Sequence, residues 1–427
     1  MSAPEPPLPR DGVRASLSLL RRNRHFRRLY VASLVSLGGD WFLLVALFGL
    51  VYELSGPLAV GLLIAAQEIP FFLVSPVGGA LADRLDRRRL MIVCDVVRTV
   101  LCLGFLLVRE ESTIWLAFAL LAAISSFSAA FDPASNAALP NLVEPDDLGP
   151  ANALTGSVWG TMLAVGAALG GIVAATLGRD AAFVIDAASF GLSAILIAGV
   201  RRSFAEARAG HVEHPGVVRA TTETARYARR DHRVLALLGV KAGFGIGAGV
   251  LVLLSVFAER VFHLGEIGIG VLMSARGVGA LIGPFLGRSL AGRDDRRLYA
   301  AIALALVLFG LGYVAFGLMP TIALAAPAVA IAHLGGGAQW TLSSYGLQRV
   351  VPDRLRGRIF AFDQALITLT LTASSLVTGW AAQRLGPRPT AIGLGVVAVA
   401  WALTWTWLTT GVRRSNSAAA LEPARSA

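Results

Sequence analysis

Charged residues are scarce in this chain and make up only 15% of its 427 residues, whereas 55% of the residues are hydrophobic. Soluble domains usually contain about 25% charged and 45–50% apolar residues. A soluble protein needs polar side chains to cover its surface, and this sequence has too few of them. Its mean hydropathy of +0.66 therefore predicts a protein whose main solvent is lipid.

The chain also has only two cysteines, Cys94 and Cys102, and both lie in one apolar segment. On a straight helix, residues eight positions apart are separated by about 12 Å, which is too far for a disulfide. The sequence contains no zinc-ligand spacing, no Walker sequence and no His, Cys or Ser constellation typical of an enzyme. We therefore expect no metal, no cofactor, no direct use of ATP and no enzymatic activity.

Twelve apolar runs are present instead, and each is long enough to cross a bilayer, which takes about 20 helical residues. In lipid the backbone must satisfy its own hydrogen bonds, so these runs are expected to be helices. The sequence therefore predicts an all-α polytopic membrane protein. The runs cover residues 29–52, 58–80, 90–108, 112–136, 152–177, 181–200, 234–261, 265–287, 298–318, 321–346, 359–385 and 390–411.

The basic residues give the chain a net charge of +11, but they are grouped in short segments between the apolar runs. Because they form no continuous basic face, they do not indicate a nucleic-acid partner. Of the 38 basic residues, 30 fall on one side of the predicted membrane, five on the other side and three inside the runs. By the positive-inside rule both termini are cytoplasmic, as expected for a multi-pass protein of the bacterial plasma membrane.

A polar, basic segment at residues 201–233 separates the first six runs from the last six. We expect this segment to be a cytoplasmic linker, with a surface helix near its end. It would join an N-terminal six-helix bundle over residues 29–200 to a C-terminal six-helix bundle over residues 234–411. The polar ends, residues 1–28 and 412–427, are expected to be cytoplasmic tails.

The two halves also repeat one another in sequence. Residues 61–67 match residues 270–276, and the same offset aligns the loops that follow the second and eighth runs. Both loops lie on the same predicted side of the membrane, so the repeat is parallel. Parallel repeats of six helices are one way in which transporters move two halves around a site at mid-membrane. The pattern thus predicts two pseudo-repeated six-helix bundles and indicates a transporter.

The segment between the second and third runs reads Gly79-Ala-Leu-Ala-Asp83-Arg84-Leu-Asp86-Arg87-Arg88-Arg89. It resembles the loop signature of the major facilitator superfamily, with Asp86 in place of the usual second glycine. With this aspartate, the segment resembles the corresponding loop in the branch that contains macrolide efflux proteins and enterobactin exporters. Residues 131–143 and 185–190 also resemble that branch. The residues that carry the signature are Gly79, Asp83, Arg84, Arg87 and Arg88.

The resemblance implies a fold of the major facilitator type and secondary active transport. It also implies that Asp83 braces a cytoplasmic gate against the start of the eleventh helix, near Arg358. The fifth run keeps Gly166, Gly170 and Gly171 of a glycine-rich motif found in drug–proton antiporters. We expect these glycines to allow close helix packing. The fourth run has no basic residue, although such antiporters commonly carry an arginine there.

Charged residues inside the apolar runs are the candidate site residues, because a charge at membrane depth is costly. Asp40 lies near the middle of the first run. It is expected to be a protonation or substrate site, or alternatively a carboxylate bonded to a neighbouring helix. Arg98 follows Asp95 by three positions, so the two side chains share a helix face and are expected to form a neutralised pair.

Glu68 and Arg276 stand at nearly equivalent positions of the repeat, and we expect both to face a central cavity with either a functional or a structural role. His333 in the tenth run is the only intramembrane side chain that titrates near neutral pH in water. It is an alternative proton carrier to Asp40, or a hydrogen-bonded structural residue. Lys241 in the seventh run is expected to extend toward the membrane surface.

Three further acidic residues, Asp132, Asp186 and Asp363, lie nearer the predicted cytoplasmic ends of their runs, where we expect them to brace gates and helix termini. The function that fits these features best is secondary active export of small amphiphilic molecules such as drugs, macrolides or siderophores. The expected partners are a small-molecule substrate, membrane lipid, and protons or another coupling ion, with a monomeric chain. The alternatives are a metabolite importer driven by ion symport and a transporter-like sensor.

Overall fold

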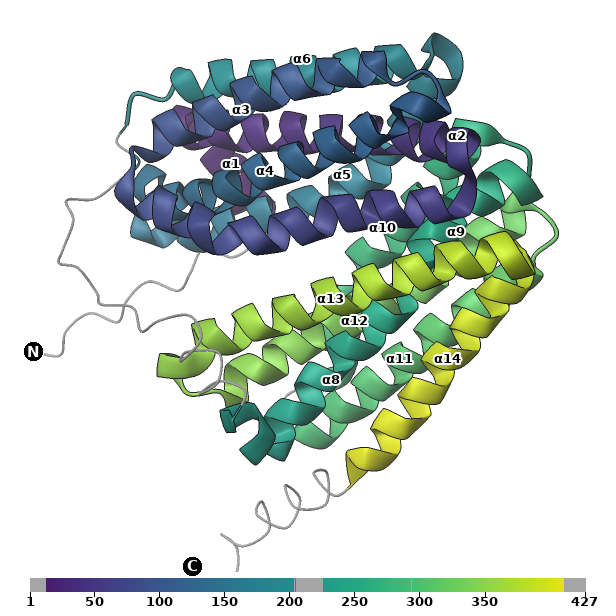
Figure 1. Cartoon of the computed structure of the whole chain (residues 1–427). Helices are drawn as coiled ribbons and strands as arrows, with labels where there is room; N and C mark the ends of the chain where they lie inside the picture. The colour runs from purple at the N-terminus through teal and green to yellow at the C-terminus, as the bar shows by residue number, and fades with distance from the viewer. Residues whose placement is uncertain (1–12, 203, 205–225, 293, 411–427) are drawn as a thin grey trace, which may run out of the picture.

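The computed structural model describes residues 13–202, 204, 226–292 and 294–410, and this part of the chain is helical and contains no strand. Figure 1 shows the helices running side by side in two groups. The α-helices are α1 (Val13–Arg22), α2 (Arg24–Arg84), α3 (Arg87–Gly104), α4 (Ile114–Leu142), α5 (Leu148–Leu177), α6 (Arg179–Ala198), α8 (His232–Gly247), α9 (Val250–Val256), α10 (Gly265–Ala291), α11 (Asp295–Leu318), α12 (Ile322–Val350), α13 (Asp353–Leu385) and α14 (Pro387–Leu408).

Eleven helices in the described part of the chain are long and apolar enough to cross a membrane. The first of them, α2, covers both the first and the second predicted run. Its backbone leaves the helical conformation at Gly56, where φ is 77° and ψ is −166°. Glycine adopts this conformation without strain, and Pro57 then begins the next helical stretch. The ribbon turns back on itself (Figure 1), so α2 supplies two crossings and the prediction of about twelve is confirmed.

The seventh crossing is built from three pieces, because α8, α9 and a π-helix at Phe257–Val261 follow one another. The break between α8 and α9 is stabilised by a side chain of α13. Ser374 accepts a hydrogen bond from the Gly249 amide at 3.1 Å and donates one to the carbonyl of Ile246. A hydroxyl thus replaces helical hydrogen bonds that the break removes, as lipid-embedded backbone requires.

The structure differs from the expected N-terminal tail, since α1 begins at Val13 and α2 begins at Arg24. Asn23 caps α2 by accepting hydrogen bonds from the amides of His25 and Phe26. Phe26 is buried together with Leu19 of α1 in a small apolar cluster. The core of the N-terminal half therefore begins before residue 29. The expected linker and the C-terminal tail lie largely outside the described residues, although residues 226–230 are helical.

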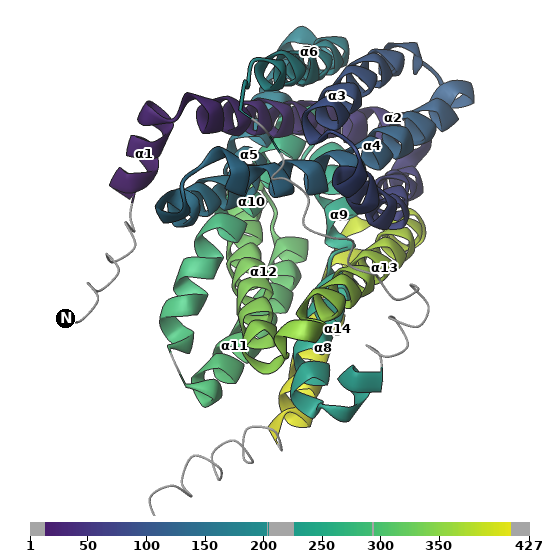
Figure 2. The same ribbon diagram turned by 90° about the vertical axis from the view of Figure 1, so that its left-hand side faces the viewer.

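Helices α2–α6 pack into an N-terminal half, and α8–α14 pack into a C-terminal half. Figure 2 shows the first half above the second. The halves meet where α5 packs on α10 and where α2 packs on α13. These contacts are close. A Cβ atom added at Gly171 would lie 3.0 Å from Gly270, and one added at Gly61 would lie 2.7 Å from the carbonyl oxygen of Ser375. Small residues thus let the two backbones approach, as is common between membrane helices.

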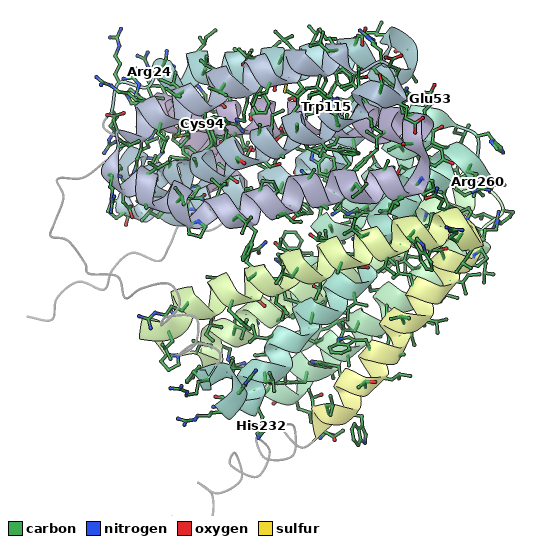
Figure 3. All side chains as sticks on the ribbon, in the orientation of Figure 1. Arg24, Glu53, Cys94, Trp115, His232 and Arg260 are labelled. Carbon is green, nitrogen blue, oxygen red and sulfur yellow. The ribbon has the colours of Figure 1, made fainter. Side chains whose placement is uncertain are left out.

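The two ends of the molecule differ in the residues that they carry. Figure 3 shows Arg24 and His232 at one end, which we name the basic end, and Glu53 and Arg260 at the other, which we name the opposite end. The ribbons of the two halves converge toward the opposite end and diverge toward the basic end (Figure 1). This arrangement places the closest contacts between the halves on the side away from the basic end.

Candidate functional site

The first charged group lies inside the N-terminal half around Arg98 of α3. The Arg98 side chain is only 3% exposed and forms an ion pair with Asp95, one turn earlier on the same helix. It donates to Ser128 Oγ of α4 at 3.2 Å. Its guanidinium also lies over the rings of Phe131 and Phe190, at 4.5 and 4.3 Å from their centroids. Arg98 is therefore held between α3, α4 and α6, and the structure places it in the pair that the sequence predicted.

Asp40 of α2 lies close enough to this arginine for the two charges to interact. Its neighbour Gly39 is packed against α6 so closely that an added Cβ would lie 2.5 Å from Asp186 Oδ1. Asp186 is completely buried and accepts hydrogen bonds from Cys102 Sγ at 3.0 Å and Ser189 Oγ at 3.2 Å. The carboxylates of Asp40 and Asp186 thus sit on facing helices at the same depth, close enough for their charges to interact.

Asp132 of α4 completes the group, because its charge and those of Asp40 and Asp186 all interact with Arg98. We name Asp40, Asp95, Arg98, Asp132 and Asp186 the Arg98 cluster. Asp186 is completely buried whereas Asp132 is exposed, and the expectation that both residues brace gates and helix ends stays a prediction. The sequence signal was acidic residues in the first, third, fourth and sixth runs, but their convergence depends on how each helix is rotated. Four carboxyl groups around one guanidinium form a site that can bind protons.

A second group lies in the C-terminal half, where Tyr313 of α11 and His333 of α12 contact each other. The Tyr313 hydroxyl is 2.5 Å from His333 Nε2, and both side chains are buried. Arg276 of α10 is close enough to interact electrostatically with both of them. The structure therefore gives His333 the hydrogen-bonded environment that was its structural alternative, next to a permanent positive charge.

Arg276 also reaches across to the N-terminal half. Its guanidinium lies 5.7 Å from the ring centroid of Trp159 on α5, and its charge interacts with that of Glu68 on α2. The charges of Glu68 and Arg276 thus interact between the two halves, and the expectation that both residues face a central cavity stays a prediction. We name Glu68, Arg276, Tyr313 and His333 the Arg276 group. It contains charged residues from both halves.

Lys241 of α8 does not extend toward the membrane surface, as the sequence had suggested. Its ammonium forms an ion pair with Asp363 of α13 at 2.6 Å, and the two side chains are 4% and 2% exposed. Ser344 Oγ lies 3.1 Å from the same nitrogen, and the Trp340 ring centroid lies at 4.3 Å. A partner of opposite charge at the same depth neutralises the lysine directly, so extension to the surface is unnecessary. Asp363 accordingly pairs with Lys241 rather than bracing a helix terminus.

The junction between α2 and α3 is held in place by Arg87 and Arg88, the first two residues of α3. Arg87 donates to the carbonyl oxygens of Ala137 at 2.9 Å and Phe204 at 3.1 Å. Arg88 donates to the last carbonyls of α6, at Ile197 and Ala198. Cations at a helix C-terminus are favourable because the unpaired carbonyls carry partial negative charge. These two residues therefore tie the junction to the basic ends of α4 and α6.

The acidic and glycine positions of this junction have other roles. Asp86 caps α3 by accepting a hydrogen bond from the Arg89 amide at 2.8 Å. Asp83 is 69% exposed and lies 3.8 Å from Arg87, and its predicted contact with the region of Arg358 stays a prediction. A Cβ added at Gly79 would have no neighbour within 4 Å. A Cβ added at Gly78 would lie only 2.2 Å from the carbonyl oxygen of Ala129 on α4. The close approach in this motif is thus made by Gly78.

The glycines of α5 face two different partners. A Cβ added at Gly166 would lie 3.1 Å from Trp41, and one at Gly170 would lie 2.9 Å from Phe42, both on α2. Gly171 instead faces α10, where Gly270 approaches it. The three predicted packing glycines therefore hold α5 between its own half and the other half.

A site that sequence reasoning missed lies at the opposite end. Arg179, the first residue of α6, donates to Glu53 of α2 and to Glu266 of α10, each at 2.6 Å. Glu259 of the π-helix is a third carboxylate close enough to interact with it. The only signal in the sequence was the occurrence of isolated acidic residues near these helix ends, which does not reveal their pairing.

Comparison with known proteins identifies the family to which this arrangement belongs. The sequence profile described as the Major Facilitator Superfamily matches residues 29–366 and 259–425. The chain belongs to this superfamily. It is a membrane transporter of the major facilitator type, not an enzyme. Among the described residues, no three His, Cys, Asp or Glu side chains are grouped so that they could hold a metal ion.

Several proteins are similar in sequence to this major facilitator. The multidrug efflux pump Tap of Mycobacterium tuberculosis is 26% identical over 86% of this chain and 88% of its own length. The putative bacilysin exporter BacE of Bacillus subtilis is 24% identical over 73% of this chain and 77% of its own. The uncharacterised transporter YfiS of Bacillus subtilis is 30% identical, but the match spans only 42% of this chain and 43% of that protein.

Solved structures show the same fold. A POT family transporter bound to 5-aminolevulinic acid has a TM-score of 0.74 and 10% identity, over 92% of this chain and 97% of that one. A bacterial homologue of the human lysosomal transporter Spinster, in an inward-facing and occupied conformation, has a TM-score of 0.70 and 14% identity, over 91% and 97%. At these identities the similarity concerns the fold.

Proposed function

We propose that this major facilitator exports small amphiphilic molecules, of the drug, macrolide or siderophore type, in exchange for protons. The observation that carries the proposal is the Arg98 cluster, in which one buried arginine pairs with Asp95 and interacts electrostatically with three further carboxyl groups, and in which Asp95 and Asp186 are completely buried. Burying several carboxylates with a single cation is unfavourable unless some of them hold protons. The similarity to Tap and BacE, which are named as an efflux pump and an exporter, supports the direction of transport.

We further propose that the basic end faces the cytoplasm of a bacterial cell, so that both termini are cytoplasmic. Support comes from the uneven distribution of basic residues across the membrane. With this orientation the halves are closed on the outside by Arg179 and its partners and diverge toward the cytoplasm. The structure would then represent the inward-facing state, which receives substrate before export.

In this proposal the segments 29–200 and 234–411 rock against each other as a monomer, and α2 couples the two charged groups. Asp40 lies in the first crossing of α2 and Glu68 lies in the second. Substrate near Arg276 would alter the balance of charge around Glu68, while closure over Asp40 would change its exposure to water. A proton bound by the Arg98 cluster in one state is thereby released in the other.

The test is transport in inverted membrane vesicles with an imposed pH gradient. A proton-coupled exporter should accumulate a lipophilic cationic dye, a macrolide or a siderophore when the vesicle interior is acidic. A protonophore should abolish that accumulation. If accumulation does not depend on the pH gradient, transport is not coupled to protons. Substrate uptake into right-side-out cells that is driven by an ion gradient would favour the importer. Absence of transport for every tested class would favour the sensor.

A further inference from the structure

A groove of about 1330 Å³ lies at the basic end of the C-terminal half. Its walls come from α8, α13, α14 and the segment 227–231. Every described residue that lines it belongs to the C-terminal half or to the segment just before α8. The groove is thus separate from the Arg98 cluster and the Arg276 group, and the transport proposal assigns it no role.

The mouth of the groove is basic. Arg229, Arg230, His232 and Arg233 line it, and all four are exposed. Asp231 is the acidic residue among the lining residues, and its carboxylate is paired with Arg233 at 3.2 Å. Partial burial raises the pKa of Asp231, but the hydrogen bonds from Arg233 outweigh this effect and hold that pKa below its ordinary value. Asp231 is therefore ionised and engaged with Arg233, which leaves Arg229 and Arg230 to attract an anion.

Below the mouth the groove is apolar. Gly239 and Ala242 of α8 form one wall, and Trp401 and Trp405 of α14 form another. The indole nitrogen of Trp401 donates to the Gly239 carbonyl at 3.2 Å, and that of Trp405 donates to the Ala236 carbonyl at 2.7 Å. α8 satisfies both polar atoms, and Trp405 is only 3% exposed, so the occupant would mainly meet the apolar part of the half-buried Trp401 ring.

The length of the groove identifies the kind of occupant. From His232 to Ala242 is ten residues along α8, or about 15 Å, which matches one leaflet of a hydrocarbon core about 30 Å thick. A basic mouth followed by an apolar channel of one leaflet's depth fits an amphiphile with an acyl chain, whereas free phosphate would use only the mouth. We propose that this groove binds an anionic phospholipid, with its phosphate at Arg229 and Arg230 and an acyl chain along α8.

Native mass spectrometry of the full chain tests this proposal. The protein is released from nanodiscs that contain equal amounts of dioleoylphosphatidylglycerol and dioleoylphosphatidylcholine, and the retained lipid is counted. The wild type should retain phosphatidylglycerol preferentially. The Arg229→Gln and Arg230→Gln double variant should lose about 25-fold of that preference, because each basic residue near a membrane surface adds roughly five-fold.

A matched control removes two exposed arginines at the same end but outside the groove, by Arg296→Gln with Arg297→Gln, and should keep the preference. Gly239→Leu tests the apolar channel. A Cβ at Gly239 would make only an ordinary contact, 3.5 Å from the Trp405 ring, so leucine should fill the groove without displacing α14. This variant should retain less of either lipid, and glycerol 1-phosphate, which lacks acyl chains, should not compete.

The proposal is overturned if the wild type shows no preference, or if the control pair loses as much as the groove pair. It is also overturned if Gly239→Leu retains lipid like the wild type, or if glycerol 1-phosphate displaces the lipid. Transport is not a readout in any of these measurements. Their outcome is therefore independent of whether the chain exports its substrate with protons.

Discussion

Arg179 Nε lies 2.6 Å from Glu266 Oε1, and these two residues belong to different halves of the molecule. The same guanidinium pairs with Glu53 of its own half at 2.6 Å. Arg179 is thus a bridge between α2 and α10 at the opposite end, beyond the contact of Gly171 with Gly270. This ion pair joins the halves only when they are closed at the opposite end. It therefore stabilises the closed state relative to a state in which the halves are open at that end.

We expect Arg179→Gln to shift the halves away from this arrangement. The side chains of Arg179 and Glu266 are 24% and 16% exposed, so solvent screens their attraction and the pair contributes about 0.5–1 kcal/mol. The ratio of closed to open molecules at this end should therefore fall about two- to five-fold. With one spin label on each half, at positions 111 and 264, the measured distance distribution between the labels should gain a population at longer distance.

The matched control for this prediction is Arg109→Gln. Arg109 makes two hydrogen bonds of 2.9 Å with Asp180 at the same end, but both residues lie in the N-terminal half. Removing that pair should leave the distance distribution unchanged. Equal shifts in the two variants would mean that charge loss, and not the bridge between halves, controls the state.

Asp40→Asn should abolish uphill export driven by a pH gradient while leaving downhill exchange of substrate intact. The reason is that asparagine keeps the shape of the side chain near Arg98 but cannot carry a proton. Transport in inverted vesicles measures both activities. If His333→Gln gives this phenotype and Asp40→Asn does not, the proton carrier is in the Arg276 group. Gradient-driven export in both variants would show that neither residue is indispensable.

Gly277→Ala should destabilise the contact between α5 and α10. An added Cβ would lie 2.5 Å from the backbone nitrogen of Ala164, and overpacking of this kind costs about 1–3 kcal/mol. The control is Gly393→Ala on α14, where no atom lies within 4 Å of the added Cβ. That change should be neutral or stabilising by up to about 1 kcal/mol, because alanine favours the helix. Thermal unfolding in detergent should give shifts of opposite sign, and equal shifts would contradict the close approach.

Lys241→Met should lower stability strongly, by about 3–5 kcal/mol, because it leaves the Asp363 carboxylate buried without its cation. One oxygen of that carboxylate, Oδ1, already has no hydrogen-bond partner. The double variant Lys241→Met with Asp363→Leu should recover most of the loss, since it removes both charges. Thermal unfolding of the three proteins measures the effect. A double variant no better than the single one would show that the pair is needed for more than mutual neutralisation.

Asp83→Asn should reduce transport while leaving membrane insertion and abundance close to wild type. Asp83 is 69% exposed, so its loss costs little folding energy, whereas the proposed gate would lose a charge that it needs at the basic end. Asp86→Asn is the control, because asparagine caps a helix as well as aspartate does. Wild-type transport by Asp83→Asn would identify the position as a solvated loop residue without a role in gating.

The sequence by itself determined the number of membrane crossings, the helical class of the fold and the family signature. The length of an apolar run is a local property, and lipid leaves the backbone little choice except a helix. The gap between the first two predicted runs contains the bend of α2 at Gly56, whereas the start of this helix after Asn23 precedes the expected residue 29. Even the pair Asp95–Arg98 follows from a spacing of three along one helix.

Only the tertiary structure decided which of the other charges meet. Lys241 pairs with Asp363, 122 residues away, and Arg179 pairs with Glu266, 87 residues away. Such pairs depend on the rotation of each helix about its axis and on which helices are neighbours. In an almost uniformly apolar sequence, no pattern of polar and apolar faces specifies that rotation, and close packing through small residues such as Gly39 and Gly171 specifies it instead.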